Sequence, residues 1–250
     1  MTRCALRTTV VPAFILFCVF AARSLAAPQP QNYLYKTTLV QAAPGKLIDL
    51  IAVYKSMWAA QAKSTDDPAP FWIRHSQGDR WDLLILFPAG SYGDYFQPER
   101  AAAREKAAQP WNEKLKQDIA WQEDEFVYGP PLEVVKKAFS SAGFFHVEMF
   151  EALPGKQPDL LKEREMENAY ARSVKQPENL IFVRDQGAPW DLFTIGCYRN
   201  LKHYAESGDV ADRDREAAAK AAGFANGDDI GPYLRKFISL HHDTLAVAVK

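Results

Sequence analysis

The chain has 250 residues, of which 48% are hydrophobic and 24% are charged, a composition typical of a globular protein with a sizeable core. Basic and acidic side chains nearly balance, and the formal net charge is −1. A chain without excess positive charge has no electrostatic attraction for nucleic acid or for an anionic membrane, so we expect neither as a partner.

The first 26 residues have the pattern of a secretory signal peptide. Arg3 and Arg7 precede an apolar run from Thr8 to Ala22, and small residues before Ala27 suit a cleavage site. The apolar run, about 15 residues, is shorter than the roughly 20 residues that span a bilayer. We therefore expect a periplasmic or secreted protein that leaves the membrane after cleavage. Loss of three arginines with the leader would change the net charge from −1 to −4.

Cysteine usage is simple once that leader is set aside. Cys4 and Cys18 lie within it, so Cys197 would be the only cysteine of the mature chain. An intramolecular disulfide is then excluded. A single cysteine on a predicted strand is interpreted as a small core residue rather than as a nucleophile.

The remaining sequence contains one pattern twice. A Pro-Gly-Lys segment occurs at Pro44–Lys46 and again at Pro154–Lys156, and Trp81 and Trp190 each begin a Trp-Asp-Leu unit. The two copies align at an offset of 110 positions up to Arg74 and of 109 from the Trp-Asp-Leu unit onward. This internal duplication predicts a first repeat at residues 32–130, a linker helix at 131–142 and a second repeat at 143–250.

Each repeat is predicted to contain the same elements in the same order. The first has strands at 32–41, 71–75, 81–87 and 123–128, with helices at 46–63 and 99–116, the second of these interrupted at Pro110. The second has strands at 143–151, 180–185, 190–197 and 242–249, with helices at 154–174 and 201–220 and a short helix from Gly231. The order strand-helix-strand-strand-helix-strand is that of a ferredoxin-like unit.

One such unit has a helix-covered sheet face and a bare face, so two units can close a barrel by packing their bare faces together. This arrangement resembles the dimeric α+β barrel superfamily with both subunits fused in one chain. The strand-Pro-Gly-Lys-helix segment is similar to that of antibiotic-biosynthesis-monooxygenase-type and NIPSNAP-type domains. The resemblance implies an α+β fold of two tandem ferredoxin-like repeats, and a monomer or a homodimer. It does not select an activity, because the superfamily includes oxygenases, isomerases and haem-handling proteins.

The first strand of the second repeat carries the candidate catalytic residues. Phe144, His146 and Glu148 alternate along one face, which we expect to line the barrel interior. The closing strand would bring His241, His242 and Asp243 near them. His146 or His242 could then act as acid–base with Glu148 as its orienting partner. The alternatives are solvated histidines without a chemical role and, least favoured, a metal or haem site.

Matched arginines on the second strands are candidate ligand-binding residues. Arg74 follows Trp72 by two positions, and Arg184 follows Phe182 in the same way, so each could clamp a carboxylate or stack on a planar molecule. The favoured alternative is an ion pair with the aspartate of each Trp-Asp-Leu unit. Thr194 completes the candidate ligand-binding set, together with Phe144.

The charged run at residues 162–165 is interpreted as a solvated helix face. Taken together, the sequence predicts a protein that binds or transforms a small aromatic or apolar molecule, without an organic cofactor and without a metal. The alternative is a non-catalytic ligand-binding or structural barrel.

Overall fold

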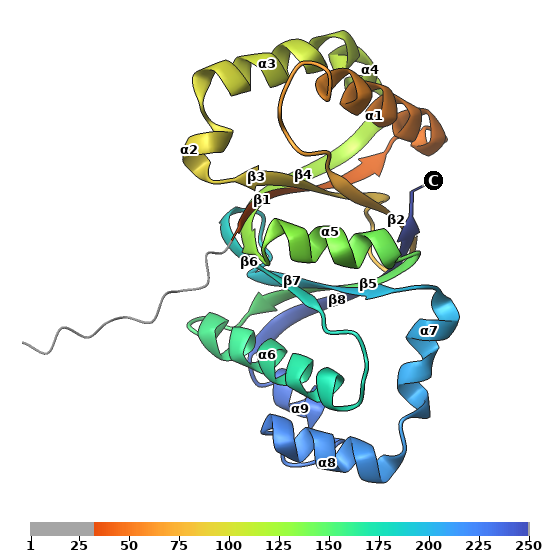
Figure 1. Cartoon of the computed structure of the whole chain (residues 1–250), viewed down its shortest axis with the longest axis vertical. Coiled ribbons are helices and arrows are strands. Elements are labelled where there is room, and N and C mark those ends of the chain that lie inside the picture. Colours follow the sequence, from red (N-terminus) through yellow and green to blue (C-terminus); the bar gives the residue numbers. More distant parts are fainter. Residues whose placement is uncertain (1–32, 250) are drawn as a thin grey trace, which may run out of the picture. The chain divides into compact units, whose positions relative to one another are not determined.

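Eight antiparallel strands close into a barrel in the computed structural model, which describes residues 33–249 (Figure 1). The strands are β1 (Tyr33–Ala42), β2 (Phe71–Gln77), β3 (Leu83–Gly90), β4 (Ile119–Gly129), β5 (Phe144–Ala152), β6 (Leu180–Gly187), β7 (Leu192–Tyr198) and β8 (Ile238–Ala248). Around the barrel they follow the order β1-β3-β2-β8-β5-β7-β6-β4. The predicted leader lies outside the described residues. No helix within residues 33–249 is long and apolar enough to cross a membrane.

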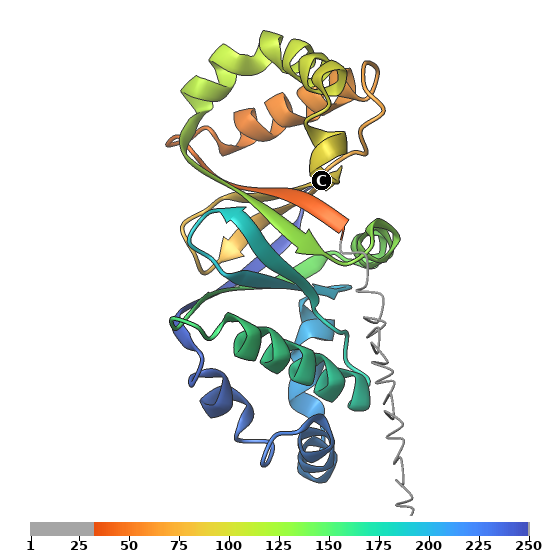
Figure 2. The same cartoon turned by 90° about the vertical axis from the view of Figure 1, so that its left-hand side faces the viewer.

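Helices lie on both outer sides of the barrel, with α1, α3 and α4 on one side and α6, α8 and α9 on the other (Figures 1 and 2). Their bounds are α1 (Leu47–Gln61), α2 (Tyr92–Tyr95), α3 (Pro98–Ala108), α4 (Asn112–Asp118), α5 (Leu132–Ser141), α6 (Gln157–Ser173), α7 (Leu201–Ala205), α8 (Asp212–Ala222) and α9 (Ile230–Leu234). Short 3₁₀ turns at Gln109–Trp111 and Glu206–Asp209 divide the two long helical regions that the sequence predicted. The α+β class with an antiparallel sheet is confirmed.

The strand order separates the chain into two neighbouring sets. β4-β1-β3-β2 come from the first half and β8-β5-β7-β6 from the second, and in each set the fourth strand of that half pairs with its first. That pairing is the one expected of a ferredoxin-like unit. The sets join through antiparallel pairs of β2 with β8 and of β4 with β6.

The barrel interior is filled by apolar side chains from both sets of strands. Its fully or nearly fully buried members include Tyr35, Trp81, Phe145, Phe182 and Phe193. Burial of such large side chains contributes roughly 1.5–3 kcal/mol each, so this cluster supplies a major part of the stability. Cys197 packs against the same cluster, and burial raises the pKa of its thiol to about 12, in agreement with its predicted role as a core residue.

The predicted facing of β5 is wrong. Phe145, Val147 and Met149 lie in the barrel interior, whereas Phe150 packs on the opposite face against Leu160 of α6. The set that contains the ionisable residues therefore faces the helix. The physical reason is that the interior offers mainly apolar contacts, while α6 supplies charged partners for the ionisable side chains of the strand.

The register of β2 and β6 corrects the matching of the two arginines. The backbone N–H of His75 donates to the carbonyl oxygen of Asp82 at 2.9 Å, and that of Arg184 donates to the carbonyl oxygen of Asp191 at 3.1 Å. His75 therefore corresponds to Arg184, and Arg74 does not. The single-residue deletion lies before the second strand of the second half, within the connection that follows α6.

Candidate functional site

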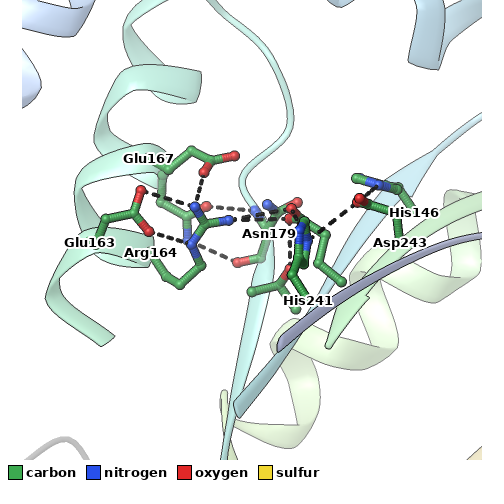
Figure 3. A network of polar contacts seen from close by, with 10 residues as sticks. His146, Glu163, Arg164, Glu167, Asn179, His241 and Asp243 are labelled. Atoms are coloured by element: carbon green, nitrogen blue, oxygen red, sulfur yellow. Dashed lines mark hydrogen bonds and ion pairs between the residues drawn. The ribbon is translucent and has the colours of Figure 1, made fainter. Parts of the chain in front are cut away.

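Two adjacent strands place four ionisable side chains beneath α6 (Figure 3). His146 and Glu148 alternate on β5, and His241 and Asp243 alternate on β8, with Glu148 directly opposite Asp243. Because alternate residues of a strand share a face, both pairs point away from the barrel interior and toward the helix. We refer to these four residues as the β5–β8 quartet.

Glu148 is the most deeply buried member of the quartet, with only 7% of the residue exposed. Its Oε2 accepts a hydrogen bond from the Thr194 hydroxyl at 3.1 Å and lies 3.3 Å from Nη1 of Arg164. Burial by itself favours the neutral acid, but a contact with His241 and the positive charge of Arg164 outweigh it and lower the pKa of Glu148. The side chain is therefore an ionised carboxylate inside the protein.

Arg164 of α6 holds this carboxylate and two others. Its guanidinium is bound by Glu163 through two hydrogen bonds, Nε to Oε2 at 2.7 Å and Nη2 to Oε1 at 2.9 Å. Nη2 also lies 2.5 Å from Oε2 of Glu167, and the guanidinium carbon lies 4.9 Å from the centre of the Phe150 ring. Burial opposes the charge of Arg164, but the surrounding carboxylates raise its pKa above the ordinary value. The planar fork of arginine suits this simultaneous binding.

Only part of the helical charged run is solvated, which corrects the sequence-based interpretation: Lys162 and Glu165 are exposed, but the two residues between them are buried. Glu163 is fully buried and Arg164 is 2% exposed. Burial raises the pKa of both Glu163 and Glu167 even though Arg164 acts in the opposite direction. About a quarter of the Glu167 side chain reaches solvent, at 27%, so this residue lies at the margin of the cluster.

His146 forms the outer end of the network. Its Nε2 lies 3.0 Å from Oδ1 of Asp243. Burial lowers the pKa of His146, but the hydrogen bond with Asp243 and the charge of Glu148 raise it by more. The hydrogen bond with His146 in turn lowers the pKa of Asp243, although partial burial opposes this. The two side chains form a charge-assisted pair.

A pocket of about 390 Å³ opens onto this pair and is lined by Gln77, Gly78, His146, Tyr204, Asp243 and Leu245. The His146 and Tyr204 rings lie 5.4 Å apart between centroids. A Cβ at Gly78 would lie 2.3 Å from the carbonyl oxygen of Asp243, so only glycine lets this turn approach β8 so closely. A molecule in the pocket would meet His146 and Asp243, with Glu148 behind them.

His241, and not His242, joins the quartet. The ring of His241 stacks on Phe150, with centroids 4.6 Å apart and an interplanar angle of 3°. His242 points to the other face of β8, where its Nδ1 lies 2.9 Å from Oδ2 of Asp79 and its ring lies 5.0 Å from Trp190. The sequence interpretation brought both histidines near β5 but chose His242 as the site residue. It also began the strand at residue 242, whereas β8 begins at Ile238.

The predicted ligand-binding residues are divided among separate places. Thr194 donates to Glu148, and the Phe144 ring lies 5.6 Å from that of Tyr204, so both belong to the neighbourhood of the site. Phe182 is instead buried in the barrel interior, stacked on Phe193. The sequence interpretation missed Arg164, Glu163 and Glu167. It brought His241 and Asp243 near β5 but did not choose them as site residues.

The two arginines and Trp72 lie away from the quartet. Arg184 forms an ion pair with Asp191 at 2.6 Å, as the favoured sequence interpretation predicted. Arg74 faces the α1 side and lines a different pocket of about 600 Å³, and within residues 33–249 no ion pair joins it to Asp82. Trp72 packs edge-on against Trp58, with ring centroids 4.6 Å apart.

The corresponding positions of the first half carry different chemistry. Lys36 stands where the second half has His146, and its Nζ lies 3.2 Å from Oδ1 of Asp124. Thr38 and Tyr54 stand in place of Glu148 and Arg164. The buried charged cluster therefore belongs to the second half.

Comparisons with known proteins identify the fold. No protein-family model matches the sequence, and no curated protein matches it. An anthrone oxidase-like protein matches in structure with a TM-score of 0.57 and 11% identity, over 88% of this chain and 92% of that one. A proposed monooxygenase from Fusobacterium nucleatum has a TM-score of 0.53 and 8% identity, over 88% and 93% of the two chains. One from Lactobacillus acidophilus has a TM-score of 0.51 and 9% identity, over 87% and 94%. These likenesses confirm a ferredoxin-like α+β fold.

Proposed function

We propose that this protein is an enzyme that transforms a small aromatic or apolar molecule in the pocket beside His146. One observation carries the proposal: the pocket exposes a histidine–aspartate pair whose polar atoms lie within 4.8 Å of a carboxylate oxygen of the buried, ionised Glu148. An ionised carboxylate beneath an accessible histidine is costly to maintain in a fold, and such arrangements are concentrated at functional sites.

The pocket favours a molecule with an apolar ring and at least one polar atom. Tyr204, with the Phe144 ring packed against it, forms an aromatic side, Leu245 adds an apolar wall, and His146 and Asp243 supply polar atoms. His146 is placed to exchange a hydrogen bond and a proton with the bound molecule, and Asp243 orients its ring. The chemistry that these residues supply needs no organic cofactor. The anthrone oxidase-like and monooxygenase neighbours motivate assays with small aromatic compounds.

We further propose that the barrel arose by fusion of two ferredoxin-like repeats, as in a NIPSNAP-type or antibiotic-biosynthesis-monooxygenase-type dimer joined into one chain. Matching hydrogen bonds support this origin. The backbone N–H of Ala42 donates to Oδ2 of Asp82 at 2.8 Å, and that of Ala152 donates to Oδ2 of Asp191 at 2.8 Å. Fusion supplies each half with its partner, so the chain would act as a monomer or a homodimer. The leader-like sequence supports export to the periplasm or medium.

Replacing His146 by alanine tests the assignment. The protein is isolated from its natural source and denatured, and the small molecules that it releases are identified by mass spectrometry. Turnover of these molecules by the folded protein is then assayed. We expect the variant His146→Ala to lose turnover by about 10²–10⁴-fold, the range of a positioned acid–base group. His242→Ala is the matched control and should retain turnover, because His242 lies on the neighbouring strand β8 and contacts Asp79 and Trp190 instead of the pocket. Undiminished turnover in His146→Ala would contradict the assignment.

A further inference from the structure

We propose that the β5–β8 quartet, His146, Glu148, His241 and Asp243, binds one divalent transition-metal ion. The inference rests on the proposed function only for the pocket through which a substrate would reach the ion. It changes how His146 acts: with an ion in place, His146 and Asp243 are ligands, and the ion polarises the bound molecule.

The donor atoms have the spacing that a metal ion requires. Nε2 of His241 lies 3.5 Å from Oε1 of Glu148 and 3.5 Å from Oδ1 of Asp243, and Nε2 of His146 lies 3.0 Å from Oδ1 of Asp243. The donor atoms of His146, Glu148 and Asp243 all lie within 4.8 Å of one another. Around a four-coordinate ion with bonds of about 2.0–2.1 Å, neighbouring donors are about 3.3 Å apart. The three separations of 3.0, 3.5 and 3.5 Å are close to that value.

The orientation of His241 is a second, independent observation. Its side chain is 10% exposed, and its Nε2 is buried without a hydrogen bond of good geometry. Stacking on Phe150 fixes the ring so that this nitrogen points between the carboxylates of Glu148 and Asp243. A buried ring nitrogen without a well-aligned hydrogen bond is costly, and coordination of a cation would satisfy it.

The charge around the quartet also favours a cation. Glu148, Glu163, Glu167 and Asp243 supply four carboxylates, and Arg164 is the one guanidinium that contacts them among the described residues. The quartet therefore lies in an excess of negative charge. A divalent ion would offset it while leaving both histidines neutral, the form that binds metals.

The surroundings assign separate tasks to the two oxygens of Glu148. Oε2 is engaged by the Thr194 hydroxyl and by Arg164, whereas Oε1 is the oxygen nearest His241. Such outer contacts orient the ligands of metal sites. Two imidazoles with two carboxylates, and no thiolate, suit Zn²⁺, Mn²⁺, Fe²⁺ or Co²⁺. The pocket side of the ion would be open to an oxygen donor of the substrate.

Cobalt binding to the untagged full-length mature chain tests the inference. The protein is dialysed against a chelator, then titrated with Co²⁺ while visible absorption and bound cobalt are measured. We expect about one Co²⁺ per chain, displaced by Zn²⁺. His241→Ala should weaken binding by more than about 10-fold, because even loss of an outer-shell contact costs about 10–100-fold. His242→Ala, the neighbouring histidine on the other face, should bind as the parent does.

Three results would overturn the inference: no bound cobalt in the parent, unchanged binding in His241→Ala, or equal losses in the two histidine variants. If His241→Ala does not fold, Asp243→Asn decides, since that side chain is 57% exposed and should tolerate the change. The outcome is separable from that of the proposed function. Metal binding without any small-molecule turnover would support the ion site and contradict the proposed enzymatic function. Turnover that the chelator does not affect would support the enzymatic function and contradict the ion site.

Discussion

Replacement of Arg164 by methionine is expected to destabilise the fold by about 3–5 kcal/mol, the range measured when one partner of a buried ion pair is removed. Methionine keeps much of the side-chain volume but leaves Glu148 and Glu163 buried without their cation. Urea unfolding at pH 7 measures the loss. Acidification should reduce the difference between variant and parent, because protonated carboxyl groups no longer need the guanidinium.

Arg172→Met on the same helix is the matched control. Arg172 forms its ion pair with Glu178 in solvent, so its removal should leave the unfolding midpoint nearly unchanged. Equal stability of Arg164→Met and the parent would contradict the account of the cluster as a tightly coupled charge network. A large loss in both variants would point to a helix-wide effect instead.

Glu125→Gln is expected to stabilise the protein at alkaline pH and to change it little at pH 5. Glu125 lies on β4, is 4% exposed, and neither of its carboxylate oxygens has a hydrogen-bond partner among the described residues. Burial and the nearby charge of Glu123 raise its pKa to about 8, against the opposing charge of Arg184. The neutral acid is therefore the form compatible with the fold.

The sign of the pH dependence follows from this shift. The folded protein holds the Glu125 proton more tightly than the unfolded chain, whose glutamate has an ordinary pKa of 4.5. The corresponding stability is complete below that value and is lost as the pH rises toward about 8, at about 1.4 kcal/mol per pKa unit. Unfolding free energies at pH 5, 7 and 9 measure it. Glu133→Gln, at a side chain 80% exposed, is the control. If the difference in unfolding free energy between the parent and Glu125→Gln is the same at all three pH values, the prediction is wrong.

The fold was largely predictable because its signals are local. Alternation of apolar residues predicted the strands, and the Pro-Gly-Lys segments indicated the helices that follow β1 and β5. The prolines are not the first helical residues that the sequence predicted, because α1 begins at Leu47 and α6 at Gln157. Alternation also grouped His146 with Glu148 on one face. It could not decide which face lies inside, because that depends on whether α6 or the barrel interior offers charged partners.

The remaining site residues could not be predicted from the sequence pattern of one helix or strand, because their burial depends on which elements pack together. Arg164 looked like part of a solvated run, and only the spacing of Leu160, Glu163 and Glu167 along one helical stripe could have indicated a buried face. The sequence brought both His241 and His242 near β5, and no pattern in it fixed the choice of His242 as the site residue. Since adjacent strand residues face opposite ways, that choice exchanges one histidine for the other.

The central claim is that the pocket beside His146 is where this protein meets a small molecule. A crystal structure of the protein isolated from its native source tests it most directly. We expect electron density for a small molecule in contact with His146 and Tyr204, in the pocket beside the β5–β8 quartet. A bound molecule found instead in the pocket beside Arg74, with only water next to His146, would contradict it.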